Sequence, residues 1–250
     1  MAPITPLSAL GILAAGTAAG TINTVVGSGS LITFPTLLAA GYSPVVANVT
    51  NTLGLVPGSI SGAVGYRREL VGQGHRVRTL GLASLLGGTT GAVLLLTLPG
   101  SVFERVVPVL ILVACALVAL QPRLRDLLAA RGHRGHGLAL TVFATGVYGG
   151  YFGAAQGVIL MALLSIFVVD DLQRLNGLKN VLAALVNGIA AVLFVVFGHI
   201  VYGAAAILAV GAIAGGQLGA TYGRRLPPAT LRVLIIVVGV IVASKLLLTG

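Results

Sequence analysis

The residues best suited to chemistry are glycines and serines placed inside a long apolar run. The stretch VVGSGSLITFP covers residues 25–35. Glycine lets the backbone approach a ligand closely, and serine hydroxyls cap helices or donate to a ligand. Irregular backbone in a hydrocarbon layer is tolerated only where it is buried in protein or lines a polar cavity. We therefore expect a ligand-facing helix break at Gly27, Ser28, Gly29 and Ser30.

A second break is expected in FGAAQGV, residues 152–158, where Gln156 and Gly157 stand in equivalent places. In inverted-repeat membrane proteins, broken helices meet near the bilayer midplane and point free N–H groups at an anion. We therefore expect the two breaks to face each other. The alternative is that glycines only let helices pack closely. We prefer this alternative for Gly16, Gly20, Gly87 and Gly91.

Polar side chains gather near the start of the third apolar segment of each half, at 44–66 and 177–198. ANVTNT contains Asn48, Thr50 and Asn51, and NGLKN contains Lys179 and Asn180. Polar residues in such segments usually face the protein interior. Lys179 is suited to supply positive charge to an anion, or alternatively to lie at the cytoplasmic surface near Asp170, Asp171 and Arg174. For Asn48 and Thr50, helix capping and interhelical hydrogen bonds are the alternative.

Catalytic and metal-binding sets are not expected. No Ser-His-Asp set, carboxylate pair or phosphate loop can be assembled at a common depth, which argues against an enzyme and against a cofactor. His133 and His136 have a spacing compatible with a metal, but a solvated linker is the simpler interpretation. The five acidic residues fall in loops or at interfaces, so no buried carboxylate is expected to relay protons. They are Glu69, Glu104, Asp126, Asp170 and Asp171.

The composition predicts a membrane protein. The 250 residues are 57% hydrophobic and 8% charged, and the mean hydropathy is +1.06. No water-soluble domain covers that much apolar surface. The net charge of +10 comes from basic clusters between apolar runs, which is typical of membrane topology rather than of nucleic-acid binding. Cys115 is the single cysteine, so no disulfide within the chain is expected, and the N-terminus lacks the basic region of a signal peptide.

An internal repeat organises the chain. Gly16, Gly20 and Gly27 recur 130 residues later, whereas GGTTGA at 87–92 recurs as GGQLGA at 215–220, an offset of 128. This predicts a first transmembrane repeat at 1–120, a cytoplasmic basic linker at 121–136 and a second transmembrane repeat at 137–250. Each repeat divides into five apolar segments, of which the second is too short to cross a bilayer comfortably. The expected segments are 7–26, 30–41, 44–66, 78–98, 102–120, 138–156, 158–169, 177–198, 201–222 and 230–248.

The basic loops predict the orientation of the two repeats. Lysine and arginine in short loops stay on the cytoplasmic side. RRELVGQGHRVR, residues 67–78, is therefore expected inside, and GHIVYG, residues 198–203, outside. The predicted fold is an all-α polytopic membrane protein with two inverted-topology repeats and broken or re-entrant helices at the repeat interface. Both termini are expected on the outer face of the inner (plasma) membrane.

Residues 16–68 resemble the sulfite exporter TauE/SafE family. The resemblance is carried by the Gly-rich break, the following Pro35, the G-x-x-P-x-x-A pattern that begins at Gly41, then Thr50 and Tyr66-Arg67-Arg68. It extends nearly end to end. It implies transport of a small sulfur-containing anion, such as sulfite or an organosulfonate, across the lipid bilayer.

Electrostatics predicts a direction for such transport. Moving one negative charge out of a cell with a negative interior gains about 2.3 kcal/mol per 100 mV. We therefore expect an exporter that works by alternating access, with an anion channel or a proton-coupled uptake permease for organosulfonates as the alternatives. The glycine-rich faces are also compatible with a homodimer.

Overall fold

The protein forms an all-helical bundle, as expected. The computed structural model describes residues 4–129, 137–222 and 228–249. These ranges contain ten α-helices and no strand. The helices are α1 (Pro6–Val25), α2 (Ser30–Ala39), α3 (Pro44–Gly65), α4 (Gly74–Thr97), α5 (Gly100–Ala129), α6 (Leu138–Tyr151), α7 (Gln156–Phe167), α8 (Leu172–Phe197), α9 (Tyr202–Tyr222) and α10 (Pro228–Thr249).

Most helix boundaries match the expected segments within a few residues, and the exceptions have local causes. The expected start of α8 at 177 is wrong, because Asp171 caps a helix that begins at Leu172 and accepts a 2.8 Å hydrogen bond from the Gln173 N–H. Helix α5 does not end at 120 but continues to Ala129, into the expected linker. The remainder of that linker, with His133 and His136, lies outside the described residues.

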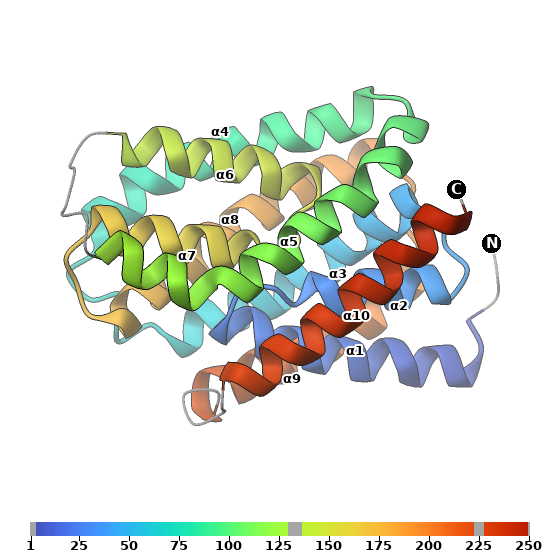
Figure 1. Ribbon diagram of the computed structural model, residues 1–250, viewed down its shortest axis with the longest axis horizontal. Coiled ribbons are helices and arrows are strands. Elements are labelled where there is room, and N and C mark those ends of the chain that lie inside the picture. The colour runs from blue at the N-terminus through green and yellow to red at the C-terminus, as the bar shows by residue number, and fades with distance from the viewer. Residues whose placement is uncertain (1–3, 130–136, 223–227, 250) are drawn as a thin grey trace.

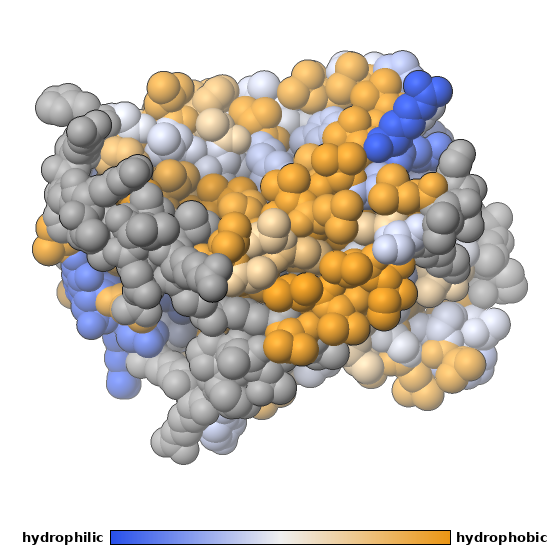
Figure 2. All heavy atoms as spheres, in the orientation of Figure 1, coloured by the Kyte–Doolittle hydropathy of each residue, from blue (hydrophilic) through white to orange (hydrophobic). Residues whose placement is uncertain are grey.

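The helices have the lengths and surfaces of membrane-spanning segments. Among the described residues, five helices are long and apolar enough to cross a bilayer: α1, α4, α5, α8 and α9. Helices α2 and α7 have only 10 and 12 residues. Figure 2 shows hydrophobic side chains across the middle of one face and hydrophilic ones toward the two ends. Exposed leucine and phenylalanine side chains such as Leu10, Leu82 and Phe197 suit contact with lipid tails.

The helices group differently from the order of the sequence. Helix α9 packs chiefly on α1 and α3, and α4 packs chiefly on α6 and α8. We call α1, α2, α3 and α9 the first bundle, and α4, α6, α7 and α8 the second bundle. The two bundles meet mainly where α3 packs against α8 (Figure 1). Each bundle therefore contains three consecutive helices of one half and one helix from the other half.

Glycine contacts hold α9 and α4 in these exchanged positions. A Cβ added to Gly16 would lie 2.6 Å from the Leu208 carbonyl oxygen, and one added to Gly87 would lie 3.0 Å from the Gly146 Cα. Gly20 and Gly91 make main-chain contacts that are just as close. At all four positions the preferred interpretation, close helix packing, is confirmed.

Helix packing pairs positions in the two halves at a spacing different from the 130 residues expected from the glycines. Gly215 lies against Thr17 and Thr21, and its counterpart Gly87 lies against Phe143 and Val147. Thr17 and Phe143 are 126 residues apart, so the 130-residue offset read from the glycines does not relate equivalent packing positions. The ends of α1 and α6 and the starts of α2 and α7 keep the same 126-residue spacing. Helices α3 and α8, like α4 and α9, begin 128 residues apart.

Gly91→Ala is expected to lower the melting temperature. The new methyl group would collide with the Val147 main chain and lie 2.7 Å from the Tyr151 nitrogen. Overpacking of this kind costs about 1–3 kcal/mol. The matched control is Gly188→Ala, because nothing lies within 4 Å of that added methyl group and alanine is favoured in helices by about 0.5–1 kcal/mol. Thermal unfolding of the purified protein measures both changes, and equal effects would contradict this account of the α4–α6 contact.

Candidate functional site

Both expected helix breaks are present. Helix α1 ends at Val25 and α2 begins at Ser30, and between them Gly27 has a φ of 92°. Helix α6 ends at Tyr151 and α7 begins at Gln156, and between them Gly153 has a φ of 77° and Ala155 a φ of 59°. The left-handed backbone favours glycine at positions 27 and 153, because a residue with a side chain is strained in this conformation.

The two breaks touch each other through their main chains. The Gly157 N–H donates to the Gly27 carbonyl oxygen at 3.1 Å. A Cβ added to Gly157 would lie 2.5 Å from the Gly27 Cα, so this contact admits no side chain at either position. The expectation that the breaks face each other is confirmed.

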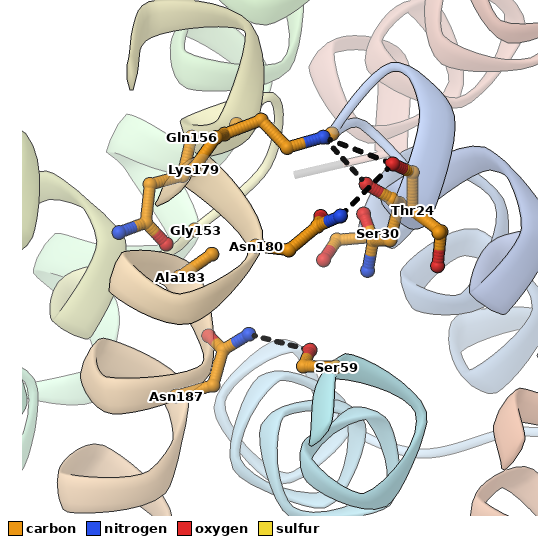
Figure 3. A pocket seen from close by; sticks show the side chains of 12 residues that line it. Thr24, Ser30, Ser59, Gly153, Gln156, Lys179, Asn180, Ala183 and Asn187 are labelled. Carbon is orange, nitrogen blue, oxygen red and sulfur yellow. Dashed lines mark hydrogen bonds between the residues drawn. The ribbon is translucent and has the colours of Figure 1, made fainter. Parts of the chain in front are cut away.

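A small polar cavity lies beside this contact (Figure 3). It has about 20 Å³ of space for the centre of a water molecule, which is room for about one water. None of its described lining residues is acidic. They are Asn23, Thr24, Gly27, Ser30, Ser59, Gly153, Gln156, Gly157, Lys179, Asn180, Ala183 and Asn187.

Lys179 is the charged residue of the cavity lining. Its side chain is buried, with 1% of the residue exposed, so the alternative placement at the cytoplasmic surface is wrong. The Nζ atom donates to the carbonyl oxygens of Asn23 at 3.0 Å and Thr24 at 3.3 Å (Figure 3). These carbonyls lie in the last turn of α1, where a helix leaves its acceptors unpaired and carries partial negative charge.

Two asparagines of α8 support the same helix end. Asn180 donates to the Thr24 carbonyl oxygen at 3.2 Å, and Asn176 donates to it at 3.1 Å. The Thr24 carbonyl therefore accepts from three side chains of α8. Asn187, farther along α8, donates to the Ser59 hydroxyl of α3 at 3.4 Å and forms the other wall of the cavity (Figure 3).

Two residues of the breaks have buried polar atoms without a hydrogen-bond partner. Gln156 is 3% exposed and its Nε2 atom is unpaired; the amide lies over Gly149, which has no side chain to obstruct it. Ser28 is 1% exposed and its hydroxyl is unpaired. A buried donor without a partner costs about 1–3 kcal/mol, so such groups mark places where another molecule can supply the missing acceptor.

The remaining expected site residues lie away from the cavity. Asn48 donates to the Tyr151 carbonyl oxygen at 3.0 Å and so supports the end of α6. The Thr50 hydroxyl accepts from the Val201 N–H at 3.1 Å, and Asn51 accepts from the Thr33 hydroxyl at 2.5 Å. For Asn48 and Thr50 the interhelical alternative therefore describes the contacts. Gly29 donates its N–H to the Asn23 side chain at 2.6 Å, and neither Gly29 nor Ser28 lines the cavity.

The structure adds lining residues that the sequence did not single out as site residues. Asn23 and Thr24 precede the first break, Gly153 lies within the second, and Ser59 and Asn187 face each other from α3 and α8. A signal was available for two of them, because asparagine is rare in apolar helices and usually faces the interior. Ser59 gave no such signal, since serine is common in helix contacts.

Asp170 has its own partners at the basic end of the molecule. Its carboxylate accepts hydrogen bonds from Arg76 and, at 2.7 Å, from Arg174. These contacts, chiefly that of Arg76, hold the pKa of Asp170 below its ordinary value. Gln73 donates to the Arg174 carbonyl oxygen at 3.0 Å, so the α3–α4 connection is tied to the start of α8.

Apolar helices surrounding an internal polar cavity, with two helix breaks in contact beside a buried cation, define a polytopic membrane protein of the transporter class. The chain belongs to the sulfite exporter TauE/SafE family, whose model matches residues 12–246. The resemblance seen in residues 16–68 is thereby confirmed.

Relatives over nearly the whole chain bear transporter names. The chain is 28% identical over 233 residues to "Probable membrane transporter protein YfcA" of Escherichia coli K12, covering 92% of this chain and 86% of the relative. It is 24% identical to a "Probable membrane transporter protein" of Haemophilus influenzae, covering 92% and 91%. It is 26% identical to "Probable membrane transporter protein ORF9" of a Sinorhizobium species, covering 92% and 88%. No solved structure matches the chain. These names indicate a transporter rather than an enzyme.

Asp170→Asn is expected to lower the melting temperature at neutral pH, because Arg76 and Arg174 lose their carboxylate. A carboxyl whose pKa is lowered by folding stabilises the protein above its unfolded pKa, and this stabilisation is lost as the pH falls through the folded pKa. The difference in melting temperature between wild type and variant should therefore shrink as the pH falls below about 5. Glu104→Gln, at an exposed carboxyl, is the control. A difference that stays constant over this range would contradict the role of the Asp170 charge.

Proposed function

We propose that this chain transports small sulfur-containing anions, such as sulfite or organosulfonates, out of the cell by alternating access. The observation that carries the proposal is the meeting of both helix breaks with Lys179 at one cavity whose described lining has no carboxylate. A buried cation surrounded by amide and hydroxyl donors favours an anion. Membership of the TauE/SafE family supports sulfur oxyanions as the class.

The proposed binding residues are those of the lining that can donate hydrogen bonds. Lys179 supplies the charge, and Asn180, Ser30 and Gln156 supply neutral donors. Gln156 has an unpaired donor for this purpose. The N-termini of α2 and α7, which begin at Ser30 and Gln156, add the partial positive charge of helix ends.

The size of the cavity supports a mechanism with moving parts. With room for about one water, it is smaller than an anion that carries three oxygens. Such an anion requires the surrounding helices to separate. We propose that the two bundles are the moving bodies, rather than the two sequence halves, because α4 and α9 are packed into the opposite bundle.

The chain directions support inverted repeats. In Figure 1, α1 and α6 run in opposite directions along the long axis, as do α5 and α10. Helix α1 begins and α10 ends at the same end of the molecule. Arg76 and Arg174 meet at Asp170, and this contact joins the starts of α4 and α8 at the opposite end. We propose that this basic end faces the cytoplasm of an inner (plasma) membrane, so that both termini lie outside.

Lys179→Met is expected to reduce sulfite flux into proteoliposomes at least about 10-fold, since hydrogen bonds to charged groups contribute about 1.5–3 kcal/mol. Gln156→Leu should reduce the flux by about 3- to 10-fold, the effect of one neutral hydrogen bond. The matched control is Arg105→Gln, which removes one positive charge at an exposed position of α5. Sulfite, thiosulfate, sulfate, taurine and sulfoacetate form the substrate panel.

The same assay tests the proposal as a whole. Flux no faster than through empty liposomes for every anion of the panel would refute it. Saturating flux without large single-channel currents supports a transporter over an anion channel. Dependence of the flux on an imposed pH gradient would instead favour the proton-coupled permease.

A further inference from the structure

The donors that hold the end of α1 are the same donors that line the cavity. Lys179 and Asn180 donate to the carbonyl oxygens of Asn23 and Thr24, and both lie in the cavity lining. In an uninterrupted helix these two carbonyls would accept from the N–H groups of residues 27 and 28. The break removes those partners, because the Gly27 N–H donates instead to the Ile22 carbonyl oxygen at 2.9 Å. The α1 carbonyls therefore depend on α8.

These hydrogen bonds also join the two bundles. Helix α1 belongs to the first bundle and α8 to the second, and the two helices are in contact over only a short stretch. Within that stretch, Asn176, Lys179 and Asn180 make four hydrogen bonds to α1. Loss of these bonds would release the end of α1 from α8, because little other contact holds the two helices together. The Gly27–Gly157 contact beyond the helix end would then be the main link between this end of α1 and the second bundle.

The other break has no such arrangement. At the end of α6, Asn48 of α3 donates to the Tyr151 carbonyl oxygen, as Asn176 of α8 does to Thr24. The 128-residue spacing of α3 and α8 places Asn51 and Thr52 where α8 has Lys179 and Asn180. Asn51 accepts from Thr33, and the Thr52 hydroxyl donates to the Asn48 carbonyl oxygen at 3.0 Å within its own helix. Among the residues that the structure describes, only the end of α1 is therefore held by a cation.

We infer that an anion entering the cavity competes with the C-terminal carbonyls of α1 for Lys179 and Asn180, so that its binding releases the end of α1 from α8. This inference rests on the proposed function. A carbonyl oxygen carries only partial negative charge, whereas an oxyanion carries a full charge and forms stronger hydrogen bonds with the ammonium. Anion binding thereby replaces a contact between the bundles with a contact to the anion. Binding is in this way coupled to separation of the bundles.

Asn176→Ala tests the inference, because Asn176 helps to hold α1 but does not line the cavity. If anion binding releases α1, removing this bond makes the release easier and binding tighter. The dissociation constant of sulfite, measured by calorimetry on the purified full chain, should fall by about 2- to 10-fold, the range that one hydrogen bond spans. An unchanged or raised dissociation constant would overturn the inference, since it would mean that Lys179 turns to the anion while α1 stays in place.

Asn48→Ala is the matched control. It removes the equivalent asparagine bond at the end of α6, which no cation of the described residues supports. Its sulfite affinity should stay within about two-fold of wild type, below the effect of a typical hydrogen bond. Equal tightening by both variants would show a general loosening of the helices and would overturn the inference.

A measurement on the wild-type chain covers the case in which Asn176→Ala does not fold. Amide hydrogen exchange compares residues 22–30 with residues 148–156, with and without sulfite. Faster exchange at residues 22–30 alone supports the release of α1, and slower or unchanged exchange there overturns it. Absence of binding of every anion of the panel by the wild-type chain would refute the proposed function, and this inference with it. Binding without the predicted changes would refute the inference alone.

Discussion

The structure depends on how it satisfies main-chain groups that the helix breaks leave unpaired inside an apolar bundle. A backbone carbonyl without a partner in this environment costs several kcal/mol. At the end of α1 three side chains of α8 meet this need, and at the end of α6 one asparagine of α3 does so. Each break is thus supported by the opposite half of the chain. The two breaks then complete each other through the Gly157–Gly27 hydrogen bond.

Close packing of glycines brings these supports into position. Helices α1 and α9, and likewise α4 and α6, approach until their main chains touch at glycine. In a bilayer the attraction between such helices comes from packing, because lipid tails are as apolar as the helix surfaces. The result is an exchange of helices: α4 joins the second bundle and α9 the first. The exchange leaves the polar starts of α3 and α8 facing the ends of α6 and α1.

The two halves share this framework but differ in charge. Where α8 places Lys179 and Asn180 against α1, α3 has Asn51 and Thr52, which bond to Thr33 and within α3. A buried ammonium needs negative partners, and the carbonyls of α1 provide partial ones. A transporter for anions needs a cation that can be shared with its substrate. The asymmetry of the two breaks thus gives a physical basis for the anionic substrate that we propose.

Apolar composition, the two breaks and the polar starts of α3 and α8 could be predicted from the sequence alone. Local chemistry determines these features: apolar runs form membrane helices, and glycine permits left-handed backbone at positions 27 and 153. The partners of Lys179 could not be predicted, because Asn23 and Thr24 lie more than 150 residues away in the chain. The same limit applies to Ser59 and Asn187, which become neighbours only when α3 packs on α8. The spacing between matching packing positions also needed the fold, since the glycines of α1 and α6 recur 130 residues apart in the sequence whereas their packing positions lie 126 apart. Glycine spacing reports where helices approach each other, and only the packed structure decides which helix lies opposite.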